Sequence, residues 1–183
     1  MSGIAGIFNL DGRPVDRELL GRMTDVIAYR GPDRGGIWSD GPVGLGHRML
    51  CTTPESLRET QPLRDERADL CLVLDGRVDN RDELRGALLA RGARPRDDTD
   101  AELVLRAYEV WGEECPKHII GDFAFAVWDG RRRQLFCARD AIGVRPFFYH
   151  LNGQTFMFGT EVRQFFEDPT VRRRPNEIGR AHV

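Results

Sequence analysis

Ser2 is the side chain with the greatest potential for chemistry near the start of the chain, which reads Met1-Ser2-Gly3-Ile4-Ala5-Gly6-Ile7-Phe8. A serine hydroxyl acts as a nucleophile when a base takes its proton. A hydroxyl loses its proton much less readily than a thiol, whose pKa is about 8.5. Any activity of Ser2 would therefore depend on other polar groups. Such groups stand in short motifs, namely Arg30-Gly31-Pro32-Asp33, Gly44-Leu45-Gly46-His47-Arg48, Asp75-Gly76, Asp100-Ala101-Glu102, Gly121-Asp122-Phe123-Ala124-Phe125-Ala126 and Ala138-Arg139-Asp140.

The elements that must position these motifs include several short strands. Apolar or alternating segments bounded by turn residues predict strands at residues 3–8, 43–50, 70–78, 122–128, 134–138, 146–150 and 155–158. The turn dipeptides Asp129-Gly130 and Asn152-Gly153 separate segments of the last group. That group is therefore predicted to form an antiparallel meander.

Three helices are predicted among the strands. Apolar residues at helical spacing predict a helix over residues 16–29, with Asp16 as its N-cap. The capping-box pattern, an N-cap residue followed three positions later by Glu, begins at Asn80 and at Thr99, and each run ends near a glycine, Gly92 or Gly112. Helices that lie between groups of strands favour a layered α+β fold over alternating parallel units.

Composition bounds the class of protein. The 183 residues, 40% hydrophobic and 31% charged, suit one soluble globular domain. The net charge of −2 gives no overall attraction to nucleic acid or to an anionic membrane, and the arginine runs at 131–133 and 172–174 are interpreted as solvated loop charges. Four isolated cysteines predict buried thiols in a reducing compartment and no metal site. Without a predicted signal sequence or membrane span, a cytoplasmic location is expected.

Taken in order, the motifs resemble the class II (type 2) glutamine amidotransferase domain of the asparagine synthetase family, up to about Asn176. The resemblance implies a four-layer α-β-β-α sandwich of the N-terminal nucleophile (Ntn) hydrolase type, with residues 2–177 as the amidotransferase domain. Residues 178–183 do not continue it and are predicted to be a non-native tail, the alternative being an ordinary polar tail. The family's C-terminal ATP-dependent synthetase domain, with its Ser-Gly-Gly-x-Asp-Ser loop, is missing. That domain would use ATP and magnesium, whereas no cofactor is expected in this part.

The resemblance also implies the roles of five positions. Family members remove Met1, so that the free α-amino group, of pKa about 7.7–8.0, can serve as the base for a cysteine where Ser2 stands here. Asp75 replaces an asparagine that donates to the oxyanion, and Gly76 supplies the second donor through its backbone amide. Met49 replaces the arginine that binds the carboxylate of glutamine. Asp100, which would hold the amino group of the substrate, is retained.

Loss of the nucleophile, one oxyanion donor and the carboxylate clamp together predicts that glutamine hydrolysis has been lost. Two alternatives stay open: a working N-terminal serine amidohydrolase, and a glutamine-dependent asparagine synthetase of asparagine biosynthesis. The start of the chain and the segments 49–56 and 79–84 resemble the isopeptide-forming cyclases of lasso peptide biosynthesis, which do not need ammonia. The predicted partners are then the missing synthetase domain and a precursor peptide.

The other motifs receive structural interpretations. Arg30-Gly31-Pro32-Asp33 is predicted to form a fixed turn with an internal ion pair. The segment from Arg139 to Pro146 predicts a buried turn. Phe123, Phe125 and Trp128 are expected in the core.

Overall fold

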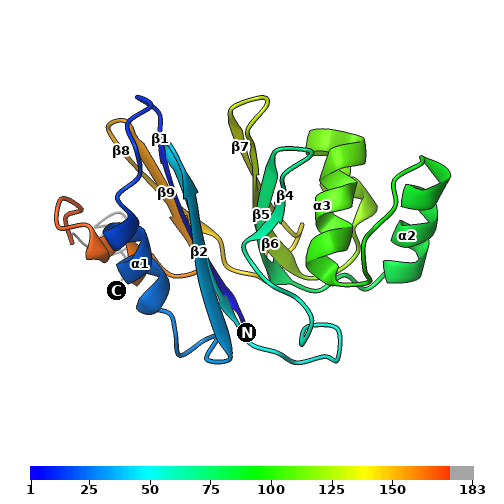
Figure 1. Cartoon of the computed structure of the whole chain (residues 1–183). Helices are drawn as coiled ribbons and strands as arrows, with labels where there is room; N and C mark the ends of the chain where they lie inside the picture. The colour runs from blue at the N-terminus through cyan, green and yellow to red at the C-terminus, as the bar shows by residue number, and fades with distance from the viewer. Residues whose placement is uncertain (174–183) are drawn as a thin grey trace, which may run out of the picture.

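Two antiparallel sheets packed face to face form the centre of the molecule, and helices cover both outer faces (Figure 1). The structure is a computed structural model that describes residues 1–173. The predictions for Arg174 and for residues 178–183 lie outside these residues. The layer order helix, sheet, sheet, helix confirms the predicted α+β sandwich.

The first sheet holds the amino-terminal strand at its centre. Its strand order is β2-β3-β1-β9-β8, and every neighbouring pair is antiparallel. The strands are β1 (Gly3–Asn9), β2 (Arg34–Asp40), β3 (Val43–Met49), β8 (Phe148–Asn152) and β9 (Thr155–Gly159). Because β3 and β9 both pair with β1, the residue just before β1 has a fixed position.

The second sheet, in the order β4-β5-β6-β7, shows that the predicted meander is wrong at one connection. Its strands are β4 (Leu63–Asp65), β5 (Leu70–Gly76), β6 (Phe123–Asp129) and β7 (Gln134–Arg139), whereas β8 and β9 belong to the first sheet. The physical reason is a turn after β7, in which the buried Asp140 carboxylate accepts hydrogen bonds from the backbone N–H groups of Gly143, Val144 and Arg145 at 2.6, 2.9 and 3.1 Å. The predicted turn is present, but its burial is wrong: Asp140 is 7% exposed, whereas Ile142 and Val144 are 90% and 51% exposed. From this turn the chain crosses to the other sheet.

Local signals set the starts of two helices. Asp16 caps α1 (Arg17–Asp25) by accepting from the N–H groups of Glu18 and Leu19, although α1 ends at Asp25 rather than at residue 29. Thr99 caps α3 (Asp100–Trp111) through the N–H of Glu102 at 3.3 Å. The short 3-10 helices η1 (Gly112–His118) and η2 (Val162–Glu167) complete the helical layers.

The predicted capping box at α2 (Arg81–Ala90) is wrong. The Asn80 side chain accepts from the N–H of Ile120 at 2.9 Å and donates to the carbonyl of His118 at 3.1 Å. Its hydrogen bonds therefore go to the segment before β6. The box at Thr99 is also incomplete, because the Glu102 carboxylate binds Arg96 instead of returning to the N-cap backbone.

Three apolar clusters fill the spaces between the four layers. The middle one lies between the sheets and contains Ile4, Val43, Leu45, Cys71, Val73, Ala124, Ala126, Trp128 and Phe158. Phe123 and Phe125 pack in the cluster beneath α2 and α3, so all three aromatic residues predicted for the core are buried. Among residues 1–173, no helix combines the length and the apolar character needed to cross a membrane.

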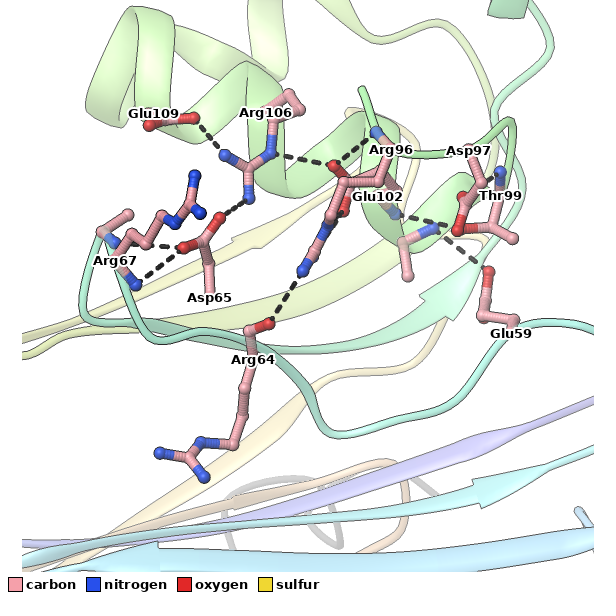
Figure 2. A network of polar contacts seen from close by, with 12 residues as sticks. Glu59, Arg64, Asp65, Arg67, Arg96, Asp97, Thr99, Glu102, Arg106 and Glu109 are labelled. Atoms are coloured by element: carbon pink, nitrogen blue, oxygen red, sulfur yellow. Dashed lines mark hydrogen bonds and ion pairs between the residues drawn. The ribbon is translucent and has the colours of Figure 1, made fainter. Parts of the chain in front are cut away.

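A buried ionic network fixes the start of α3 (Figure 2). The Glu102 carboxylate, whose side chain is 1% exposed, receives Arg96 Nη2 at 2.7 Å and lies 3.0 Å from Arg106 Nε. Arg106 also pairs with Asp65 of β4. On the other side, Glu59 accepts the N–H of Ala101 at 3.2 Å. These contacts determine where the first residue of α3, Asp100, can lie.

Gly6 is the position in β1 at which packing between the sheets leaves least room. A Cβ atom there would lie 2.0 Å from Cε1 of Phe158. Because overpacking of a core typically costs about 1–3 kcal/mol and sometimes more, Gly6→Ala is expected to lower the free energy of unfolding by about 3 kcal/mol. Urea titration followed by circular dichroism measures this value.

Gly21, in the interior of α1, gives the matched control. A Cβ at Gly21 meets no atom within 4 Å, so Gly21→Ala is expected to raise the free energy of unfolding by about 0.5–1 kcal/mol through helix propensity. Equal effects of the two substitutions would contradict the assignment of Gly6 to close packing.

Candidate active site

The five predicted site residues line one cavity of about 160 Å³ at the end of the sandwich where the chain begins. Ser2 precedes β1, Met49 ends β3, Asp75 and Gly76 end β5, and Asp100 begins α3. The cavity is also lined by Met1, Leu50, Thr52, Thr53, Ser56, Glu59, Leu74, Arg77 and Arg145. The sequence thus predicted which residues meet, and their roles remain predictions.

Ser2 is held from two sides. Its Oγ accepts the N–H of Leu50 at 3.1 Å, and its carbonyl accepts Nε of Arg30 at 3.2 Å. The nearest side-chain partner of Oγ is the sulfur of Met49 at 3.8 Å. A thioether is a weak acceptor and not a base, so Met49 does not activate the hydroxyl.

Met49 contributes an uncharged side chain to the cavity, at the position predicted to bind the carboxylate of glutamine. Its side chain is 4% exposed. The neighbouring Arg48 points the other way and pairs with Asp25 at the end of α1. Successive side chains on a strand face opposite sides, so Arg48 does not supply a charge at the position of Met49.

Asp75 is a buried carboxylate between two guanidinium groups. It is 1% exposed, with Oδ1 lying 3.6 Å from Arg145 Nη1 and Oδ2 lying 4.0 Å from Arg30 Nη2. Oδ2 has no hydrogen-bond partner among residues 1–173. Burial raises the pKa of Asp75, whereas Arg145 and Arg30 act to lower it. An ionised Asp75 accepts hydrogen bonds and cannot donate one to an oxyanion.

The internal ion pair predicted for the turn at residues 30–33 is wrong. Arg30 Nη1 binds Glu161 at 3.0 Å, and the Asp33 carboxylate accepts the N–H of Cys51 at 2.7 Å. The turn packs tightly at Gly31, where a Cβ would lie 2.4 Å from the carbonyl oxygen of Arg48. Its two charged side chains therefore bind different segments, and that of Arg30 reaches Asp75.

Asp100 is already engaged by an arginine that sequence reasoning missed. Arg81, the first residue of α2, donates Nε and Nη2 to the two carboxylate oxygens of Asp100 at 2.8 and 3.0 Å. Its Nη1 lies 3.5 Å from the carboxylate of Glu55. Burial raises the pKa of Asp100, and the bond from Arg81 acts to lower it. The capping-box pattern that marks this helix start contains no signal for the pairing.

Gly76 has a packing reason to be glycine. A Cβ at this position would lie 2.8 Å from Cβ of Phe123 and 2.9 Å from the carbonyl oxygen of Asp122. Strand β6 therefore approaches β5 too closely for any other residue.

His47 is buried and contacts Leu74, one of the residues that line the cavity. Its Nε2 lies 3.0 Å from the carbonyl oxygen of Leu74, which joins β3 to β5 across the two sheets. Because a carbonyl only accepts, Nε2 carries the proton, and Nδ1 has no partner among residues 1–173. Burial lowers the pKa of His47 to about 4.

Other predictions concern residues outside the cavity. Of the four cysteines expected to be buried, Cys71 and Cys115 are buried, whereas Cys51 and Cys137 are half-buried. Arg131, Arg132 and Arg133 are exposed, as predicted. Within the described part of the chain, no group of three or more His, Cys, Asp or Glu residues is placed to hold a metal ion.

Comparison with known sequences decides the family. The family of glutamine amidotransferase domains matches residues 1–182. The chain belongs to this family.

Two relatives of this amidotransferase domain come from Bacillus subtilis. The glutamine-hydrolysing asparagine synthetase 3 is 35% identical over 185 residues, which are 100% of this chain and 30% of that protein. Asparagine synthetase 2 is 31% identical over 180 residues, or 96% of this chain and 24% of that protein. The chain thus spans less than a third of the length of either relative.

A solved structure confirms the fold of the domain. The glutamine phosphoribosylpyrophosphate amidotransferase of Bacillus subtilis superposes with a TM-score of 0.73 at 18% identity, over 90% of this chain and 43% of that one. At this identity the similarity concerns the fold alone, and the fold is the predicted Ntn type.

The missing partner of His47 Nδ1 gives a pH prediction. An unfolded histidine, of pKa about 6.5, binds a proton before the folded one does, so the free energy of unfolding falls as the pH is lowered from about 6.5 to 4. At pH 4, this difference in pKa between the unfolded and folded states lowers the free energy of unfolding by about 3 kcal/mol. His47→Gln is expected to remove this part of the pH dependence in urea titrations, and His150→Gln is the control on edge strand β8. An unchanged slope in His47→Gln would contradict the assignment.

Proposed function

We propose that the chain is the amidotransferase-like domain of a longer ATP-dependent amide ligase and that this domain no longer hydrolyses glutamine. The supporting observation is the buried Asp75 carboxylate, with Arg145 and Arg30 at 3.6 and 4.0 Å, at the position where the family has a neutral hydrogen-bond donor. Burial, the largest influence, raises the pKa of Asp75, and Arg145 and Arg30 act in the opposite direction by favouring its charged form.

The chemistry of amide hydrolysis explains why a carboxylate at position 75 opposes glutamine hydrolysis. Attack on an amide carbonyl places negative charge on its oxygen, which donors must stabilise. Loss of one donor typically lowers the rate about 100- to 1000-fold, and a carboxylate in its place adds repulsion. Ser2, which is harder to deprotonate than cysteine, would depend on those donors more strongly.

Substrate binding supports the same proposal. An arginine bound to a substrate carboxylate contributes about 1.5–3 kcal/mol, and Met49 offers neither charge nor donor. The cavity thus lacks a group to hold the carboxylate of glutamine at this position. Loss of substrate affinity and loss of oxyanion stabilisation have separate structural causes, so restoring one does not restore the other.

A ligase that does not need ammonia would tolerate these losses. We propose that the longer protein activates a side-chain carboxylate of a precursor peptide with ATP and magnesium, and that the amino terminus of the same peptide attacks it. This is the reaction of the lasso peptide cyclases that segments 49–56 and 79–84 resemble. The synthetase domain of the longer protein would be the partner of this one, and a cytoplasmic location supplies the ATP.

A second candidate is an N-terminal serine amidohydrolase acting on another amide. The observation that favours it is that Ser2 lines the cavity and its Oγ accepts the N–H of Leu50 at 3.1 Å. It requires removal of Met1, because only then is residue 2 the chain terminus. Mass spectrometry of the purified protein decides that requirement.

Ammonia release tests the loss of hydrolysis. The protein is expected to release no more ammonia from L-glutamine than its Ser2→Ala variant, and Ser2→Cys is expected to stay inactive because Asp75 and Met49 are unchanged. A coupled glutamate dehydrogenase assay at pH 7.5 measures both. Ammonia release from glutamine that depends on Ser2 would overturn the proposal. Release from other amides alone would favour the serine amidohydrolase.

The cyclase assignment has its own test. The longer protein encoded at the locus, incubated with ATP, magnesium and the precursor peptide encoded beside it, is expected to yield a product lighter by one water, without glutamine. Liquid chromatography with mass spectrometry detects it. A product formed from aspartate only when glutamine or ammonia is present would instead identify an asparagine synthetase.

A further inference from the structure

The contacts of Arg81 give the Asp100 carboxylate, which lines the cavity, a cationic partner supplied by the chain itself. Its planar guanidinium donates two parallel hydrogen bonds to Asp100, at 2.8 and 3.0 Å, and its remaining nitrogen lies 3.5 Å from Glu55. Two parallel N–H···O bonds are the geometry in which a guanidinium recognises a carboxylate most strongly. The pair is largely shielded from water, since the side chains of Arg81 and Asp100 are 27% and 12% exposed.

A second observation concerns the other carboxylates in the lining of the cavity. Asp75 lines the same cavity and is 1% exposed, and its Oδ2 has no hydrogen-bond partner among residues 1–173. Glu59, also in the lining, is 8% exposed. Three carboxylates, of Glu59, Asp75 and Asp100, therefore line the cavity. Glu59 accepts from Gln61 and from the N–H of Ala101, and Asp75 lies beside Arg145 and Arg30. Arg81 supplies the partner of the third carboxylate, that of Asp100.

We propose that the carboxylates of Asp100 and Glu55 form a guanidinium-binding subsite beside the cavity, that Arg81 occupies it in cis, and that this occupation withholds the Asp100 carboxylate from the ammonium group of a free amino acid. The inference deepens the proposed function and rests on it in one respect, that the cavity corresponds to the glutamine site of the family. The ligand class follows from the geometry: a planar cation with two adjacent N–H donors and no carboxylate.

The occupation has a clear physical basis. An intramolecular ligand does not lose translational freedom on binding, so its effective concentration exceeds that of a free metabolite. The Arg81 backbone is fixed at the start of α2, and Asp100 is fixed at the start of α3. A free ammonium group would have to displace a two-point contact and would offer a less well matched donor set in return.

Removal of the guanidinium and its return as a small molecule tests the subsite. Arg81→Ala is expected to bind ethylguanidinium in isothermal titration calorimetry with a dissociation constant on the order of millimolar, about ten-fold or more tighter than the wild-type chain. Ethylammonium, which has one nitrogen, is expected to bind more weakly. The matched control is Arg85→Ala, one turn along α2 at an exposed position, which should behave as wild type.

The second variant assigns the binding to the carboxylate. Adding Asp100→Asn to Arg81→Ala is expected to abolish the gain in ethylguanidinium binding, because the amide presents one acceptor and one donor. If Arg81→Ala gives no cooperative thermal transition, Arg81→Gln, which keeps most of the side-chain length without the charge, is measured by the same criterion. Equal binding by the wild type, Arg81→Ala and Arg85→Ala would overturn the proposal, as would a gain that survives Asp100→Asn.

These outcomes are independent of glutamine hydrolysis. Ethylguanidinium contains no amide, so its binding is unaffected by Ser2 or by ammonia release. Ammonia released from glutamine by the wild-type chain would overturn the proposed function and the exclusion of free amino acids by Arg81, whereas the guanidinium subsite itself would still be decided by the ethylguanidinium titrations. A failed guanidinium test would leave the effects of Asp75 and Met49 on hydrolysis unchanged.

Discussion

Burial of the Asp75 carboxylate is the constraint on which the arrangement of this end of the molecule depends. An unpaired charge transferred from water to a protein interior costs several kcal/mol, so cations must approach it from other parts of the fold. Arg30 arrives from the turn after α1, and Arg145 arrives from the segment that crosses between the sheets. Arg30 continues to Glu161, just before η2. One buried charge thereby connects β5 with three segments that are distant in sequence.

The fold could be predicted as far as its determinants are local. The cap at Asp16, the glycine after α3 and the apolar residues of β3 and β5 lie within or next to the elements they define. Strand β2 was missed because its stability comes from pairing with β3, and its two glycines at 35 and 36 obscure the apolar pattern. The crossing after Asp140 was missed because a turn recognised from sequence does not specify which sheet receives the next strand.

The candidate site likewise has a part that could be predicted from the sequence and a part that could not. Its five positions were predicted from ordered motifs, and the structure brings them to one cavity. The three arginines that surround them were not predicted, since each pairing depends on how elements cross. The partners Arg81 and Asp100 are 19 residues apart on different helices, and Arg30 lies in a turn whose own carboxylate binds elsewhere. The order of the motifs predicts which residues belong to the site, whereas the pairing of their charges depends on the assembled fold.

The same contacts change the meaning of the residues that match the family. Gly76 cannot gain a side chain because β6 lies too close, and Asp100 holds α2 against the start of α3 through Arg81. Both would be kept for packing even where no glutamine is bound. Under the proposed function, Ser2, Met49 and Asp75 are the positions whose family residues would serve the substrate or the transition state, and these are the ones that differ. Retention of Gly76 and Asp100 is therefore no support for hydrolysis, because the positions that packing constrains are the ones that match.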